Sequence, residues 1–336
     1  MRACVRERLS SIGVRRVNIV VRRSLFRTPS HPPSIGAVLL SSPLAIGDHN
    51  NIFSYVTACR PPYTFVGGKN TYTHASSSRA WNGNDFMLAE VGTQQLEYRY
   101  LARATGKRDY AEKAMRAFDV LRELQPSDGL LFEHIKDGGG AGSGGGGWLS
   151  WLFKRGGNDK PAFAKGKVSF GACGDSAYEY MLKTWIQGGR KEDVYRRMWD
   201  RAMDGMHEQL LRKSSPNGLT YIANRIDGKL EHKMDHLVCF LGGSLALSAY
   251  TDPLGLDSPR ARRDLRTARA LTYTCYQMYA RTRTGMAPEY VRFEGEEDMV
   301  VPKDSPYSIL RPEAVEAFYY LSALTGDPIY RVSFRT

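Results

Sequence analysis

The sequence predicts an all-α fold built from repeated helical hairpins, and three observations support this prediction. Apolar residues recur at intervals of three and four over residues 88–122, which is the spacing of amphipathic helices. A second observation is a motif that occurs three times: a helix ends in aromatic and leucine residues, a glycine follows, and a tyrosine opens the next helix. Third, strand signals are few, and only GLTYIAN at residues 218–224 is typical of a hairpin arm.

The predicted hairpins follow one another along the chain. In the first, the Thr-Gly pair at 105–106 divides residues 88–122 into two helices. The second contains EYMLKTWIQGGRKEDVY and reaches Tyr195, and the third contains FYYLSALTGDPIY and reaches Tyr330. The first and third share one spacing of leucine, glycine and tyrosine: Leu101, Gly106 and Tyr110, against Leu321, Gly326 and Tyr330. Both a stacked solenoid and a closed α/α toroid would accommodate such repeats.

Two segments fall outside the hairpin pattern. Residues 1–48 are rich in arginine and serine, and we interpret them as a targeting segment or as the product of an incorrect gene start. Residues 137–160 contain ten glycines, but they lack the GK[ST] ending of a phosphate-binding loop and follow no predicted strand. We therefore predict a helical domain over residues 49–336 that carries 137–160 as a flexible insertion.

Charge and cysteine content exclude several classes of protein. The net charge is +12, but eight arginines against one glutamate in residues 1–30 supply most of it, and no basic stripe interleaved with aromatic residues follows. We therefore expect no nucleic-acid binding. The sequence contains no run of eighteen apolar residues, which is about the length that a helix needs to span a bilayer. The five cysteines form no CxxC pair, which argues against zinc clusters and thioredoxin-type redox motifs.

A histidine pair offers a metal-binding reading that its context weakens. His232 and His236 stand four residues apart, which is the spacing of two zinc ligands on a helix. Lys233 occupies the place that glutamate has in HExxH, and no third ligand is evident. We therefore interpret both histidines as structural.

Three pairs of acidic residues are the strongest functional signal. Each pair is spaced to share one face of a predicted helix and lies among leucine, tyrosine and phenylalanine: Glu90 with Glu97, Asp175 with Glu179, and Glu313 with Glu316. If the first helix of each hairpin lines the inside of a ring, these acids converge on its axis. Such a ring of acids can bind sugar hydroxyls, hold a hard cation or cleave a glycosidic bond. Arg99 and Arg311 lie beside the acids in sequence and could keep them ionised by pairing.

Five ordered blocks of the sequence together resemble glycoside hydrolase family 47, the class I α-1,2-mannosidases of the endoplasmic reticulum and Golgi. The blocks are LAEVGTQQLEYRYLARATG, GDSAYEYMLKTWIQGG, HKMDHLVCF, TGMAPE and YSILRPEAVEAFYYLSALTGDPIY. The resemblance implies an (α/α)7 toroid of helical hairpins, incomplete in this chain. It also implies the inverting hydrolysis of terminal α-1,2-linked mannose in N-glycans.

The resemblance implies roles for individual residues as well. Asp175 and Glu313 match the two acids that are candidates for activating water, and inversion requires roughly 6.5–9.5 Å between catalytic carboxyls to admit that water. Cys239 and Cys275 match a disulfide of the family, which suits an oxidising lumen. The remaining matches fall on substrate-binding positions: Glu97, Glu179, Glu289, Arg311 and Glu316.

Two segments of the family are not recognisable in this sequence. One carries the general acid, and the other is a C-terminal block whose threonine coordinates calcium. We therefore identify no metal ligand in this chain, although the resemblance implies Ca²⁺ as cofactor. Because a general acid contributes about 10²–10⁴ in rate, we expect little or no mannosidase activity from the 336-residue chain as written.

We therefore predict a calcium-dependent α-1,2-mannosidase, read from a partial chain. Its partners would be high-mannose N-glycans on glycoproteins, and we expect a monomer in the lumen of the endoplasmic reticulum or Golgi, with membrane anchoring left open. The alternative is a non-hydrolytic relative that binds mannose glycans in glycoprotein quality control. A third hypothesis is a structural helical-repeat protein with no sugar site.

Overall fold

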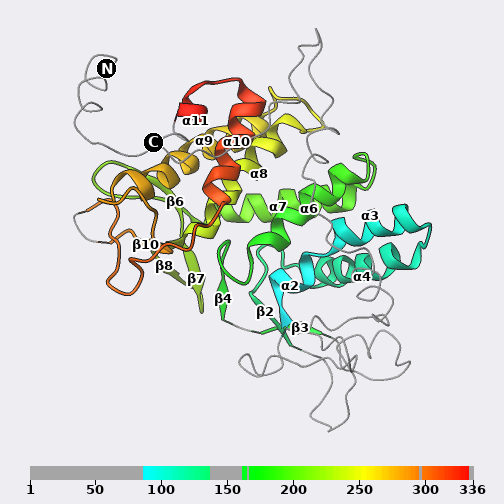
Figure 1. Ribbon diagram of the computed structural model, residues 1–336. Coiled ribbons are helices and arrows are strands. Elements are labelled where there is room, and N and C mark those ends of the chain that lie inside the picture. Colours follow the sequence, from blue (N-terminus) through cyan, green and yellow to red (C-terminus); the bar gives the residue numbers. More distant parts are fainter. Residues whose placement is uncertain (1–85, 137–160, 165, 295–296, 333–336) are drawn as a thin grey trace, which may run out of the picture. The chain divides into compact units, whose positions relative to one another are not determined.

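The computed structural model describes residues 86–136, 161–164, 166–294 and 297–332, and Figure 1 shows how their helices and strands are arranged. The helices are α2 (Leu88–Gly92), α3 (Gln95–Thr105), α4 (Asp109–Leu124), α6 (Asp175–Gln187), α7 (Asp193–Gly205), α8 (Phe240–Tyr250), α9 (Pro259–Ala280), α10 (Glu313–Thr325) and α11 (Ile329–Val332), with two short helical segments, η3 (Met206–Leu210) and η4 (His236–Cys239). The arginine- and serine-rich segment 1–48 and the glycine-rich segment 137–160 lie outside the described residues.

The helices pack as consecutive hairpins, as the sequence predicts. α3 packs on α4, α6 on α7, α8 on α9, and α10 on α11. Gly106 ends α3 and Gly326 ends α10 in the left-handed conformation, with φ of 72° and 69°. Glycine adopts this conformation without the steric penalty that other residues meet, and it commonly closes a helix in this way. The glycine of the sequence motif therefore ends the first helix in the hairpins α3–α4 and α10–α11.

The expected helix over residues 88–105 is interrupted at Thr93 and Gln94, so the prediction that Glu90 and Glu97 share one helix face is wrong. Glu90 lies on α2 and Glu97 on α3. Two glutamine side chains stabilise the break, because Gln94 donates to the carbonyl of Glu90 (2.7 Å) and Gln95 to that of Val91 (3.2 Å). These amides replace backbone donors that a continuous helix would have supplied.

The structure contains more strand than the sequence predicts. Within the described residues, the strands form four small antiparallel sheets: β1 (Phe86–Met87), β2 (His134–Lys136) and β3 (Ala162–Phe163); β4 (Lys167–Val168), β7 (Asn224–Ile226) and β8 (Lys229–Glu231); β5 (Leu211–Lys213) and β6 (Thr220–Ile222); β9 (Lys233–Asp235) and β10 (Tyr290–Arg292). The predicted arm at 218–224 covers β6 and the first residue of β7. Each strand has only two or three residues, too few for an alternating apolar pattern to be visible.

α8 is a buried helix against which α9 and α10 pack. Its ten residues from Phe240 to Ala249 are all buried, as expected of a helix that is apolar on every side. α9 and α10 both pack against it (Figure 1). Because α10 rests on this buried helix, its first turn is held in a defined position relative to η4, with which α10 also packs.

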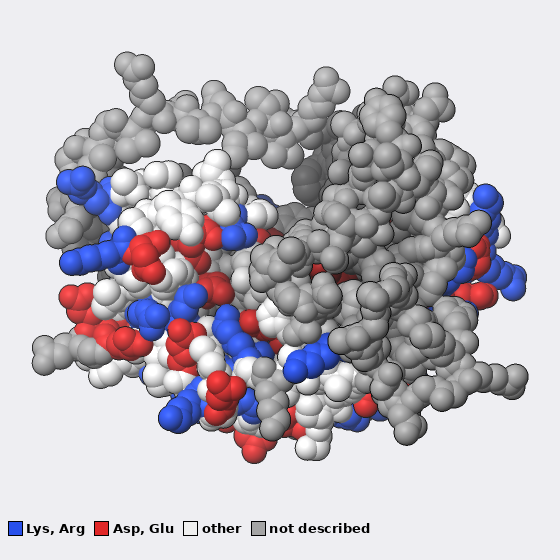
Figure 2. Space-filling view, turned by 90° about the horizontal axis from the view of Figure 1, so that it is seen from below, with Lys and Arg blue, Asp and Glu red and all other residues white. Residues whose placement is uncertain are grey.

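An ion-pair network joins α7 to α9. Arg260 and Arg263 both pair with Asp204, at 2.7 Å in each case, and Arg263 also pairs with the buried Asp264 at 2.9 Å. Basic and acidic side chains also lie interspersed over the coloured part of the face in Figure 2. Lysine and arginine side chains are thus interspersed with aspartate and glutamate side chains in the described part of the chain.

Candidate active site

Two of the predicted acids open helices that meet at one place. Asp175 is the first residue of α6, and Glu313 is the first residue of α10. Burial raises the pKa of Asp175 and the negative charge of Glu313 raises it further, whereas hydrogen bonds from Ser176 and the charge of Arg311 act in the opposite direction. Asp175 and Glu313 are therefore close enough to influence each other, although 138 positions separate them in sequence. The backbone N–H groups at both helix starts favour negative charge there.

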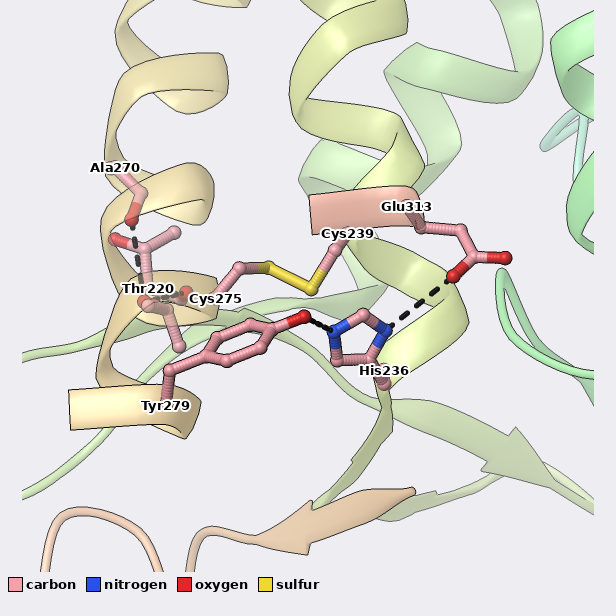
Figure 3. Close-up of a disulfide and its surroundings, with 8 residues drawn as sticks. Thr220, His236, Cys239, Ala270, Cys275, Tyr279 and Glu313 are labelled. Carbon is pink, nitrogen blue, oxygen red and sulfur yellow. Dashed lines mark hydrogen bonds and ion pairs between the residues drawn. A yellow bond between two sulfur atoms is a disulfide. The ribbon is translucent and has the colours of Figure 1, made fainter. Parts of the chain in front are cut away.

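Glu313 faces a buried histidine, as Figure 3 shows. The Nδ1 atom of His236 lies 3.5 Å from Oε2 of Glu313, and the two side chains are only 3% and 18% exposed. The other ring nitrogen, Nε2, lies 2.7 Å from the hydroxyl of Tyr279. The backbone N–H of His236 donates to the carbonyl oxygen of Glu289 at 2.8 Å.

The histidine pair is not on a helix face, so the helical reading of its spacing is wrong. His232 lies between β8 and β9, and His236 opens η4. His232 Nδ1 instead contacts the hydroxyl of Tyr221 at 2.6 Å. Sequence reasoning treated His236 as structural and so missed its position beside Glu313. The one signal that could have found it is its place in the HKMDHLVCF block.

A half-buried lysine joins the second acid of α6 to the second acid of α10. Lys183 forms an ion pair with Glu179, one turn earlier on α6, and another with Glu316 at 3.1 Å. Its ammonium also lies 5.5 Å from the ring centre of Tyr320. Burial raises the pKa of Glu179 and the charge of Glu316 adds to this, while Lys183 opposes both. The spacing of Glu179 and Lys183, four residues, is a signal that sequence reasoning could have used.

The two arginines pair differently from the expectation. Arg311 Nε donates to Glu289 Oε2 at 2.6 Å, so its partner is a predicted site residue from another segment and not a neighbour in sequence. Arg99 pairs with Glu192, just before α7, and not with a predicted site acid. The expectation for Arg99 is therefore wrong.

Glu97 lies at the edge of this cluster. Its side chain accepts a hydrogen bond from the hydroxyl of Tyr180 at 2.6 Å. Burial raises the pKa of Tyr180, and the charges of Glu97 and Glu179 add to the effect. Glu97 on α3 is thus connected through Tyr180 to the acids of α6, but unlike them it is exposed.

The acidic residues of the described part of the chain were a candidate source of calcium ligands. Among the described residues, no group of three or more His, Cys, Asp and Glu side chains is arranged to hold a metal ion. Ca²⁺ takes six to eight oxygen ligands. Glu179 and Glu316 are the acids best suited to a hard cation, yet Lys183 is already paired with both.

Comparison with known proteins gives the family. The sequence profile of glycosyl hydrolase family 47 matches residues 51–334. This chain belongs to glycosyl hydrolase family 47. The family is generally calcium-dependent.

Several similar relatives carry mannosidase names. A mannosyl-oligosaccharide 1,2-alpha-mannosidase of Arabidopsis thaliana is 36% identical over 272 residues, covering 80% of this chain and 43% of the relative. The endoplasmic reticulum mannosyl-oligosaccharide 1,2-alpha-mannosidase of Homo sapiens is 35% identical over 284 residues, covering 83% and 36%. The chain thus spans about two fifths of the length of these relatives.

A solved family 47 structure shows the fold. The alpha-1,2-mannosidase from Trichoderma reesei matches with a TM-score of 0.62 at 20% identity, covering 77% of this chain and 52% of that structure. The prediction of an incomplete (α/α)7 toroid is confirmed as a fold assignment. No helix within the described ranges is both long and apolar enough to cross a membrane.

Proposed function

We propose that this chain carries part of the active site of an inverting α-1,2-mannosidase that acts on high-mannose N-glycans. The observation that supports this most directly is that Asp175 and Glu313, at the starts of α6 and α10, lie close enough for the charge of Glu313 to act on Asp175. The mannosidase names of the family relatives support the choice of substrate. Glycoside cleavage with inversion needs a carboxylate that takes a proton from water on one face of the sugar ring.

We assign the base to Glu313 within this proposal. Burial raises the pKa of Asp175, whereas the hydrogen bonds that its Oδ1 accepts from the N–H (2.7 Å) and hydroxyl (3.2 Å) of Ser176 oppose this rise and fix the orientation of the carboxyl. Glu313 faces His236 and would accept the proton as the water attacks the anomeric carbon. Asp175 would orient that water. We assign the general acid that protonates the leaving oxygen to no residue of this chain.

The remaining predicted residues would bind and orient the mannose. Glu289 and Arg311 form a charged pair next to the strand β10, and either member could bind sugar hydroxyls. Glu179 and Glu316 present carboxylates whose charge Lys183 compensates. Their role would be to accept hydrogen bonds from hydroxyl groups, with Glu97 doing the same at the exposed edge. We keep Ca²⁺ as the cofactor that the family implies, and no step proposed here depends on it.

Mannose release from a high-mannose oligosaccharide tests the proposal. We expect the 336-residue chain to release little or none, and any activity to fall by about 10²–10⁴ in Glu313→Gln. Asp175→Asn should fall similarly, while Glu123→Gln, an exposed acid on α4, should not. The first product should have the β configuration, which NMR of the fresh product detects. Release that survives in both Glu313→Gln and Asp175→Asn would contradict the assignment.

A non-hydrolytic function is the second candidate, because the general acid is unassigned while the acids that we propose to bind sugar are present. Titration of the chain with α-1,2-mannobiose tests the sugar site that both candidates share, and Glu316→Gln should weaken binding whereas Glu123→Gln should not. Mannose release would decide for the enzyme, whereas binding without release is expected both of the binding protein and of an enzyme chain that lacks its general acid. Absence of both binding and release would exclude both candidates.

We further propose that the protein acts as a monomer in the lumen of the endoplasmic reticulum or Golgi. The disulfide between Cys239 and Cys275 supports an oxidising compartment, and several relatives carry the endoplasmic reticulum in their names. A domain over residues 49–336 remains part of this proposal. Immunofluorescence of the tagged protein with organelle markers, and its mass in solution by light scattering, test these points.

A further inference from the structure

Two buried polar atoms face each other at the proposed base. Neither Nδ1 of His236 nor Oε2 of Glu313 has a hydrogen-bond partner among the described residues, and they are 3.5 Å apart. Burying a polar atom without a partner is costly. Each atom is therefore the natural partner of the other, and hydrogen bonds at catalytic sites are often long before substrate binds.

The hydrogen positions at this pair depend on which nitrogen of His236 carries the proton. A neutral imidazole has one N–H and one bare nitrogen. If the bare nitrogen were Nδ1, its lone pair would face the carboxylate of Glu313 at 3.5 Å, and the two would repel each other. If Nδ1 carries the hydrogen, it donates to Glu313, and Nε2 must then accept a hydrogen bond from elsewhere.

Tyr279 is the group in position to make that second bond. Its hydroxyl lies 2.7 Å from Nε2, and Figure 3 shows the ring reaching His236 from the opposite side to Glu313. Burial and the charge of Glu313 raise the pKa of Tyr279 to about 12, so at neutral pH the hydroxyl keeps its hydrogen and can donate it.

The surrounding structure holds Tyr279 in this position. Tyr279 lies four residues after Cys275 on α9, which places both side chains on one face of that helix. His236 lies three residues before Cys239, and the disulfide joins the two segments. The hydroxyl of Thr274 also donates to the carbonyl of Thr220 at 2.6 Å, which ties α9 to β6.

We propose that Tyr279 is a positioning residue: its hydroxyl donates to Nε2 of His236 and so keeps the hydrogen on Nδ1, where it points at Glu313. The carboxylate is then held in one orientation for the water that it deprotonates. This inference rests on the proposed role of Glu313 as base. The hydrogen positions themselves can be measured without any turnover.

Long-range ¹H–¹⁵N NMR of the folded 336-residue chain, labelled at histidine, reads the protonation of each ring nitrogen. The chain has seven histidines, and a His236→Gln sample identifies the signal of His236. We expect the neutral Nδ1–H form at neutral pH. Finding Nε2–H or the doubly protonated ring in the wild-type chain would overturn the proposal, whether or not the protein is an enzyme.

Tyr279→Phe removes only the hydroxyl and is the deciding variant. We expect His236 to lose its single Nδ1–H form and to show Nε2–H as well. Tyr276→Phe, one turn earlier on α9, is the matched control and should leave the signal unchanged. A pure Nδ1–H form in Tyr279→Phe would show that the hydroxyl does not set it, and would overturn the proposal.

If the chain releases mannose, the kinetics of Tyr279→Phe give a second readout. Loss of one hydrogen bond that acts through the base should lower kcat by roughly 10-fold at most and leave KM nearly unchanged. A change confined to KM would contradict a role at Glu313. If the NMR spectra do not show the Nδ1–H form but the protein still releases mannose, only the role of Tyr279 is rejected. If the protein proves not to be a mannosidase, the NMR spectra still decide where the hydrogen of His236 lies.

Discussion

Asp264 shows what burial does to a single carboxyl in this chain. The residue is fully buried on α9, and its contacts are an ion pair with Arg263 at 2.9 Å and a long hydrogen bond from Ser248 at 3.5 Å. Burial raises its pKa to about 6, and the charges of Arg263 and Arg260 reduce the rise without cancelling it. Desolvation therefore outweighs the arginines at this position.

Stability should consequently depend on pH through Asp264. Between about pH 4 and pH 6, the native state keeps a proton that the unfolded chain has released, so the free energy of unfolding falls as pH rises through this window. Asp264→Asn lacks this titration. Relative to the wild type, the variant should gain on the order of 2–3 kcal/mol between pH 4 and pH 6.5, measured by urea unfolding. Asp257→Asn, at an exposed carboxylate, is the control, and a constant difference across the range would contradict the prediction.

Glycine matters at the residue scale where the backbone is left-handed and another segment is close. Gly129 has a φ of 75°, and a Cβ there would overlap the backbone carbonyl of Arg201 on α7. Gly106 has a similar φ of 72°, but a Cβ there would meet nothing within 4 Å. The two positions therefore separate backbone strain from steric overlap.

We expect Gly106→Ala to lower the free energy of unfolding by about 1–2 kcal/mol, from the left-handed conformation alone. Gly129→Ala should cost roughly 2–5 kcal/mol, because the overlap with α7 adds to the same strain. Chemical denaturation of both variants measures the difference. Equal losses would mean that the loop before β2 moves away from α7 without cost.

At the scale of elements, the contact between α6 and α10 depends on one lysine. Lys183 is 14% exposed and lies between Glu179 and Glu316, which belong to the two helices. Without it, two acids would be close together with no opposite charge. Burial lowers the pKa of Lys183, but Glu179 and Glu316 together more than reverse this, so the ammonium stays charged.

Lys183→Met should therefore lower the free energy of unfolding by roughly 3–5 kcal/mol, because it leaves buried carboxylates unpaired. Lys113→Met breaks a more exposed pair with Asp109 and should cost less than about 1 kcal/mol. Adding Glu179→Gln to Lys183→Met should restore part of the loss. A loss in Lys183→Met no greater than that in Lys113→Met would show that the lysine does not join the helices.

The helical hairpins were predictable because their determinants are local. Apolar spacing and the glycines at 106 and 326 act over a few residues, and the structure has helices and turns where these signals lie. The break between α2 and α3 was not predictable in the same way, since Gln94 and Gln95 act through side-chain hydrogen bonds that no periodic pattern reveals. The short strands were not predicted because two or three residues are too few to show an alternating apolar pattern.

At the scale of the molecule, one covalent bond joins η4 to α9. Cys239 and Cys275 are 36 residues apart, and their Cα atoms lie 5.9 Å from each other. The resemblance to family 47 implied this pair, and the structure contains it. The segments that it joins carry His236 and Tyr279, so the bond lies beside the proposed base.

Replacing Cys239 and Cys275 together by alanine should lower the free energy of unfolding by about 4 kcal/mol, chiefly because the unfolded chain regains the freedom of the 36-residue loop. A reducing agent should shift the urea transition of the wild type and leave that of the double variant in place. Cys173→Ala, at the described cysteine outside the disulfide, controls for loss of a thiol. A wild-type transition insensitive to reduction would contradict the prediction.

The sequence by itself determined the helical hairpins, the family and the set of acids from which a site could be built. Helical spacing and turn glycines act locally, and family motifs are read directly from residue order. Only the tertiary structure decided that Asp175 and Glu313 lie within electrostatic reach of each other, that Lys183 pairs with Glu179 and Glu316, and that His236 lies 3.5 Å from Glu313. These contacts join residues far apart in sequence, and they exist because α6, η4 and α10 are brought together by packing around the buried helix α8.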